Sequence, residues 1–161
     1  MGEAGRLGSL GRRAVLAWIF VVLFAGVVLW LGTPNFSASR SYSWLTAFLR
    51  FFDPDVTFDS IIWVHHLIRK GMHLFVYAIL ALLAFRASWL TFGNLLARVS
   101  MTAIFVAVGV ALIDEARQAT LVSRTGSPYD VMIDGMGAVA AVGIAVLAQR
   151  YRAGRRAREQ T

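Results

Sequence analysis

Four apolar runs restrict the fold of this chain more than any other feature of its sequence. Each run is long enough to cross the hydrocarbon core of a bilayer as a helix. Of the 161 residues, 58% are hydrophobic and 16% are charged, a balance that is unusual for a soluble domain. The predicted fold class is therefore an all-α membrane protein, a four-transmembrane-helix bundle. The spans are expected at about residues 14–31, 60–87, 98–118 and 130–150.

A single membrane domain is expected over residues 14–150, between a basic N-terminus (1–13) and a basic, disordered tail (151–161). The first run also resembles the apolar region of a signal peptide. It is long for that role, and no clear cleavage site follows it, so a retained membrane helix is favoured.

The connection between the first two spans contains apolar residues at helical spacing. These residues are Trp44, Leu45, Phe48, Phe51 and Phe52. The spacing predicts a short extracytoplasmic helix in the headgroup region, where aromatic side chains are favoured. The alternative is a loop whose aromatic side chains pack on the bundle.

The charges lie at the ends of the apolar runs and predict the orientation of the chain. With four spans, the side that holds both termini carries ten Arg residues and two acids. The opposite side carries six basic residues and seven acids. The positive-inside rule therefore places both termini in the cytoplasm, as in a multi-pass protein of the cell membrane. This explanation of the net charge of +7 argues against nucleic-acid binding.

The most polar stretch within the apolar sequence joins the third and fourth spans. Ionisable groups at this depth usually face the protein interior or a water-filled cavity, because they are costly in lipid. The inner ends of spans two, three and four carry Arg86, Arg98 and Arg150. Counting sixteen residues outward from each one reaches Lys70, Asp114 and Asp134, respectively. At about 1.5 Å per residue, all three reach one level roughly 24 Å from the inner ends. We expect them to face one another around an outer-leaflet pocket.

Helical spacing adds further side chains to this level. On the third span, Gln118 lies four residues from Asp114. The polar stripe on the second span comprises His66, Lys70, His73 and Tyr77. The stripe on the fourth span comprises Asp130, Asp134, Gly137 and Ala141. The last two are small residues, which allow helices to approach closely.

In their order along the chain, these residues resemble the VanZ-like family. The matching patterns are K-x2-H-x3-Y from Lys70, D-E-x2-Q from Asp114 and R-x5-D-x6-G from Arg124, and they cover roughly residues 66–146. The sequence departs from the family pattern at Asp134, where Asn is frequent. The resemblance implies a small multi-pass membrane protein, related to one that confers low-level resistance to the glycopeptide teicoplanin. It implies no particular reaction, so whether the chain is an enzyme stays open.

The function favoured by these features is binding of, or action on, a lipid-linked or cell-wall-precursor head group. In this hypothesis His73, Asp114 and Glu115 move protons, and Tyr77 orients them. The head group would be held by Lys70, Gln118, Arg124, Ser127, Asp130 and Asp134. Basic members of this set suit a phosphate or carboxylate.

Structural interpretations compete at each position. Lys70 could reach the lipid headgroups, and the carboxylates could pair with Lys70, Arg117 or Arg124. Ser127 or Asp130 could cap the last helix. At the level of the whole protein, the alternatives are a small transporter or flippase component and a non-catalytic membrane assembly factor.

No cofactor or metal is expected from the sequence. The chain has no cysteine, which excludes thiolate ligands. The adjacent His65 and His66, with Asp59 nearby, point to different faces of a helix. The expected partners are membrane lipids and a lipid-linked envelope precursor, with no nucleic acid. An oligomer is compatible with the sequence.

Overall fold

The computed structural model describes residues 3–33, 38–120 and 127–159, with side chains for residues 10–33, 41–120 and 127–159. The described elements are all α-helices, and four of them are long and apolar enough to cross a membrane. The predicted four-span, all-α membrane fold with a short helix between the first two spans is confirmed. The order is α1 (Glu3–Leu31), α2 (Ala38–Phe52), α3 (Phe58–Phe92), α4 (Leu96–Ala119) and α5 (Pro128–Arg158).

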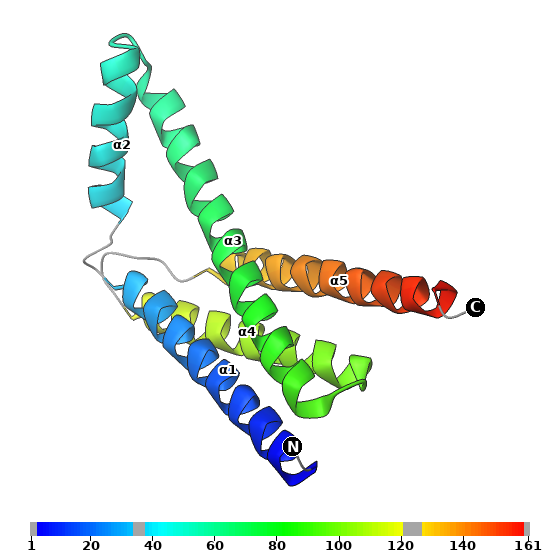
Figure 1. The fold of residues 1–161 in the computed structure, drawn as a ribbon. Coiled ribbons are helices and arrows are strands. Elements are labelled where there is room, and N and C mark those ends of the chain that lie inside the picture. Colours follow the sequence, from blue (N-terminus) through cyan, green and yellow to red (C-terminus); the bar gives the residue numbers. More distant parts are fainter. Residues whose placement is uncertain (1–2, 34–37, 121–126, 160–161) are drawn as a thin grey trace.

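The other helices are arranged around α3, which crosses them at an angle (Figure 1). Its C-terminal half packs against α1, α4 and α5, and many of the buried side chains there are small. Small side chains let helix backbones approach closely, which is the main source of packing energy inside a membrane. The buried alanines of this core are Ala81, Ala84, Ala87, Ala103, Ala107, Ala111 and Ala138.

Helix ends differ from the sequence-based expectation at two places. Arg86 was expected to end the second span, yet α3 continues to Phe92 and stops at Gly93, whose φ of 61° ends the helix. The tail beyond Arg150 was expected to be disordered, but α5 continues as an exposed helix to Arg158. Alanine and arginine are good helix formers, so an existing helix extends through this tail at little cost.

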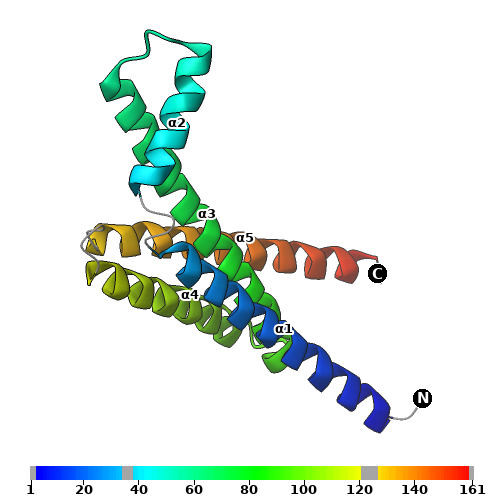
Figure 2. The ribbon, with the colours of Figure 1, turned by 90° about the vertical axis from the view of Figure 1, so that its left-hand side faces the viewer.

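The short helix α2 and the first half of α3 form an antiparallel hairpin that projects beyond the bundle (Figures 1 and 2). Ser41 Oγ and His65 Nε2 lie 2.9 Å apart across the hairpin. The Tyr42 ring makes edge contacts with the rings of Phe58 and His65. Large apolar side chains cover its outer face, among them Trp44, Phe48, Phe51, Phe52, Phe58 and Trp63. The segment is therefore a helix, and the loop alternative is wrong.

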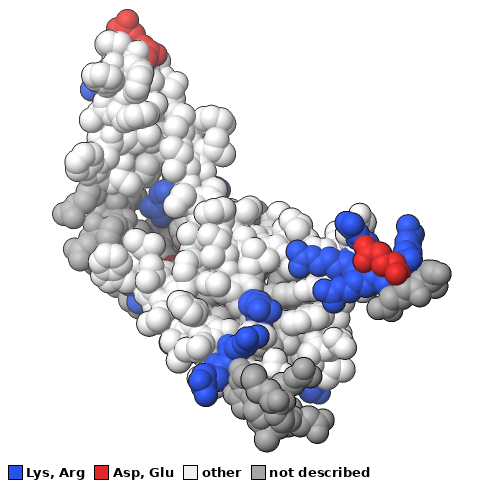
Figure 3. All heavy atoms as spheres, in the orientation of Figure 1, with Lys and Arg blue, Asp and Glu red and all other residues white. Residues whose placement is uncertain are grey.

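The two ends of the bundle differ in charge. The start of α1, the turn between α3 and α4, and the end of α5 lie at one end, where Arg side chains gather (Figure 3). We call this the basic end. The opposite end, formed where α1 and α4 finish and α5 begins, is the polar end. The functional candidates lie toward the polar end.

Candidate functional site

A very close approach of α5 to α3 brings two polar side chains together. Gly137 lies directly against the backbone carbonyl of Leu74, where a Cβ atom would overlap the backbone. One turn earlier on α5, Asp134 comes to lie beside His73, with 3.3 Å between Oδ1 and Nδ1. This distance fits an ion pair, but the two groups are not aligned for a hydrogen bond. Asp134 is 1% exposed, so it belongs to the interior.

Glu115 enters the same region from α4 and is held by the start of α5. Its Oε2 accepts a hydrogen bond of 2.8 Å from the backbone N–H of Ser127. Ser127 is the N-cap of α5, and its Oγ accepts from the N–H of Tyr129. The predicted capping role of Ser127 is thereby confirmed. Glu115 is buried, and its second oxygen, Oε1, makes no hydrogen bond to a described residue.

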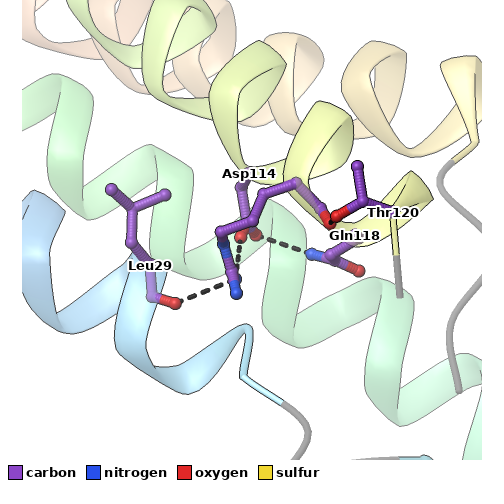
Figure 4. Close-up of polar contacts among 5 residues, drawn as sticks. Leu29, Asp114, Gln118 and Thr120 are labelled. Carbon is purple, nitrogen blue, oxygen red and sulfur yellow. Dashed lines mark hydrogen bonds and ion pairs between the residues drawn. The ribbon is translucent and has the colours of Figure 1, made fainter. Parts of the chain in front are cut away.

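Asp114, in contrast, has both oxygens occupied (Figure 4). Arg117 Nη2 donates to Oδ1 at 2.8 Å, and Gln118 Nε2 donates to Oδ2 at 2.7 Å. The same Arg117 nitrogen donates to the backbone carbonyl of Leu29 in α1 at 2.9 Å. Gly32, the first residue after α1, lies against this pair so closely that a Cβ atom would overlap it. Asp114 and Gln118 therefore belong to a network that fixes α1 to α4.

Tyr77 lies at the centre of the site and is 1% exposed. Its ring stacks with the His73 ring, with the centroids 6.4 Å apart and the planes 24° apart. The Tyr77 hydroxyl lies close to the Asp114 carboxylate without the alignment of a hydrogen bond. Several buried polar atoms here have no hydrogen-bond partner in the described structure: His73 Nδ1, Tyr77 OH, Glu115 Oε1 and both carboxylate oxygens of Asp134.

A pocket of about 280 Å³ opens beside these residues, between α1, α2 and α3. Most of its wall is apolar, and its polar lining comes chiefly from Arg69, His73, Tyr77 and Asp114. Arg69 makes no hydrogen bond or ion pair to a described residue, so its guanidinium has no described partner in the pocket wall. The remaining lining is contributed by Val28, Leu31, Gly32, Ser41, Ile68, Met72 and Val76.

Arg69 was missed in the sequence, where Lys70 was expected to face the pocket. Lys70 is exposed and is not among the residues that line the pocket. Lys70 lies on the same helical face as Tyr77, two turns earlier in the chain. Because α3 crosses the bundle at an angle, this face of the helix no longer points into the bundle there. The contact face there is the one toward α2. The spacing of Arg69, His73 and Tyr77, four and four, was the signal that could have found it.

The other predicted residues take varied positions. Asp130 is half-buried in the first turn of α5, and its charge acts on Glu115 and Asp134. Arg124 lies outside the described residues. His66 and Asp59 are exposed on α3, whereas His65 is buried against α2. The site thus contains His73, Tyr77, Asp114, Glu115, Gln118, Ser127 and Asp134, with Arg69 added.

Comparison with known proteins gives one match. A family model described as VanZ/LLP1 matches residues 14–149, which is most of the chain. The chain belongs to the VanZ/LLP1 family. The resemblance seen in the sequence is thereby confirmed, and the matched region of this VanZ/LLP1 protein covers most of each span and includes the site. No curated protein and no solved structure matches the chain.

Proposed function

We propose that this VanZ/LLP1 protein binds, or acts on, the head group of a lipid-linked or cell-wall-precursor molecule through the pocket at its polar end. Both termini would lie in the cytoplasm, so that the pocket faces the outer leaflet of the cell membrane. Reduced access of teicoplanin to its target, and thus glycopeptide resistance, would be one consequence.

The observation that carries this proposal is the composition of the pocket wall. Apolar side chains from α1 and α3 form most of the surface, as an acyl or polyprenyl chain requires. Arg69 supplies a guanidinium without a described partner at the same surface, and guanidinium groups bind phosphate and carboxylate with two hydrogen bonds. An apolar wall with one such cation suits an amphiphile with an anionic head.

The groups available for proton transfer are those whose buried atoms have no hydrogen bond. His73, which lines the pocket, can exchange a proton with a bound molecule, and Asp134 lies beside it. Tyr77 stacks on the ring of His73 and holds its orientation. Asp114 is better suited to positioning than to proton transfer, because Arg117 and Gln118 occupy both of its oxygens.

A transport path finds less support in the packing. Toward the basic end, the described core between the helices is built mainly from alanine, valine and leucine side chains. A relay of protons or ions would need polar groups through that region. The network around Asp114 does agree with an assembly role, and the experiment below separates that role from head-group binding.

The test is binding of a polyprenyl phosphate or pyrophosphate by the purified chain in lipid nanodiscs. The variants are Arg69→Gln and His73→Ala, and the control is Arg86→Gln at the basic end. We expect Arg69→Gln to weaken binding about tenfold or more, as the loss of a charge-assisted hydrogen bond does. Teicoplanin susceptibility of cells expressing each variant at equal level would follow the same order. Unchanged binding in both site variants would refute the proposal.

A further inference from the structure

Three side chains from three different helices converge on one point beside the pocket. His73 of α3, Glu115 of α4 and Asp134 of α5 each offer one ligand atom, and these atoms lie within 4.8 Å of one another. All three residues are described, two are buried and His73 is half-buried. His65 and His66 are adjacent in the sequence but point to different faces of one helix. The three residues of this cluster are far apart along the chain, and only the fold brings them together.

Each of these three side chains carries at least one buried polar atom without a hydrogen-bond partner in the described structure. Glu115 Oε1, His73 Nδ1 and both oxygens of Asp134 are buried without a hydrogen bond to a described residue. Buried polar groups are normally satisfied, and an unsatisfied group costs about 1–3 kcal/mol, more when it is charged. Unsatisfied polar atoms on all three converging side chains indicate that a ligand is to be held there.

Charge leads to the same conclusion. Two carboxylates, Glu115 and Asp134, are buried side by side, and the nearby Arg117 is already paired with Asp114. Carboxylates buried in a medium of low polarity require a compensating positive charge. Arg69 is at the pocket wall and Lys70 is exposed, and neither forms an ion pair with these acids. His73 lies 3.3 Å from Asp134 and, when protonated, supplies one positive charge for the two carboxylates. One negative charge is then still without a compensating partner in the described structure.

We propose that His73, Glu115 and Asp134 bind a divalent metal ion. One imidazole nitrogen and two carboxylate oxygens suit Zn²⁺ or Mn²⁺, whereas Mg²⁺ prefers a shell of oxygen atoms alone. Zn–N and Zn–O bonds of about 2.0–2.2 Å place tetrahedral ligand atoms about 3.3–3.6 Å apart. His73 Nδ1 and Asp134 Oδ1 are already 3.3 Å apart, and all three ligand atoms lie within 4.8 Å of one another. The most distant pair therefore has to come at most about 1.5 Å closer. Three protein ligands leave a coordination position for water or a bound molecule.

The surroundings hold these ligands as metal sites require. The Ser127 N–H fixes the second oxygen of Glu115, and the Tyr77 ring orients the imidazole of His73. Such outer contacts set the direction of the ligands and contribute to metal affinity. The inference does not depend on the proposed head-group binding, because the ion would balance the buried charge with the pocket empty.

The experiment measures metal binding by the full chain in detergent or nanodiscs, with no head group present. Protein stripped with a chelator is titrated with Zn²⁺, Mn²⁺ and Mg²⁺, and bound metal is quantified by elemental analysis and calorimetry. We expect one Zn²⁺ or Mn²⁺ per chain, much weaker Mg²⁺ binding, and a higher unfolding temperature with the bound ion. Loading with Co²⁺ adds a visible spectrum that reports on the same ligands.

The site variants are His73→Gln, Glu115→Gln and Asp134→Asn. The matched controls are His66→Gln and Asp59→Asn, which change exposed residues of α3. Each site variant should weaken binding by at least the roughly 10–100-fold that changes in outer contacts produce, and the controls should bind as the wild type does. Asp134→Glu keeps the ligand type if Asp134→Asn does not fold. Absence of stoichiometric Zn²⁺ or Mn²⁺ in the wild type, or binding that survives all three substitutions, would overturn the proposal.

Discussion

Gly137 of α5 lies against the backbone carbonyl of Leu74 in α3, at a distance that leaves no room for a Cβ atom. This contact determines how closely the two helices approach. Asp134 lies one turn before Gly137, and His73 immediately precedes Leu74, so the same approach places their side chains 3.3 Å apart. A packing contact in the apolar core thus determines the geometry of the polar site.

Gly137→Ala should therefore destabilise the protein by about 1–3 kcal/mol, the usual cost of overpacking, because the new methyl group meets a rigid backbone. Gly143→Ala on the same helix is the control, since a Cβ there meets nothing within 4 Å. We expect the control to be neutral or stabilising by up to about 1 kcal/mol. Thermal unfolding in detergent measures both, and equal stability of the two variants would contradict the close approach.

The network around Asp114 predicts strong coupling between two residues. A double-mutant cycle with Asp114→Asn and Arg117→Met should give an interaction energy in the upper part of the range of about 0.5–3 kcal/mol, because the carboxylate is buried. The exposed Arg155–Glu159 pair of α5 is the control, and its coupling should be close to zero. Unfolding free energies in mixed micelles provide the measurement. Similar coupling in both pairs would mean that the buried Asp114–Arg117 pair contributes no more than an exposed one.

Arg69 and Lys70 offer a comparison of neighbours on one helix. Arg69→Gln should weaken binding of an anionic amphiphile, because Arg69 lines the pocket. Lys70→Gln should have a much smaller effect, since the Lys70 side chain is exposed. Binding of a polyprenyl phosphate in nanodiscs reports the difference. A larger loss in the Lys70 variant would restore the sequence-based assignment.

The hairpin of α2 and α3 depends on Tyr42. Tyr42→Ala removes two edge contacts between rings, each of the kind that contributes about 0.5–1.5 kcal/mol. The two contacts together amount to about 1–3 kcal/mol, and about 1.4 kcal/mol changes an equilibrium constant tenfold. Backbone amides of α2 should then exchange with deuterium about five- to 150-fold faster, because less free energy is needed to open the helix. Trp44→Ala, on the exposed face, is the control and should leave the exchange of α2 unchanged.

The proposed orientation can be tested with single cysteines, because the chain has none of its own. Asp55→Cys places a thiol at the tip of the hairpin, and Ala157→Cys places one near the end of α5, where both native side chains are exposed. A maleimide that does not cross membranes should label intact cells through residue 55 and not through residue 157. The reverse pattern would place the pocket on the cytoplasmic side.

Several features of the site follow from spacing alone. Asp114 and Asp134 were expected at one level because helices of similar rise begin at the same basic end, and the structure brings both to Tyr77. Glu115 was expected as a neighbour of Asp114, but its bond to Ser127 crosses the α4–α5 connection, and spacing within one helix does not reveal it. The metal-ligand geometry likewise depends on three helices, so no local pattern in the sequence reports it.

The wrong pocket assignments of the second span have one physical origin, which is the angle between helices. A polar stripe predicts the contact face of a helix only where its neighbours run alongside it. His66 and Lys70 share the face of Tyr77, but α3 has left the bundle at their level, and both side chains are exposed. Helix ends were also misplaced, because a charged residue such as Arg86 does not stop a helix, whereas Gly93 with positive φ does.

The length of α3 has a consequence for the surrounding lipid. Its 35 residues extend about 52 Å, whereas a hydrocarbon core is about 30 Å thick. One wall of the pocket belongs to the bundle, and the other, formed by Ser41 and Arg69, belongs to the projecting hairpin of α2 and α3. A thicker or thinner bilayer would change the tilt of that hairpin, and with it the width of the pocket opening. Bilayer thickness thereby becomes a determinant of which molecules gain access.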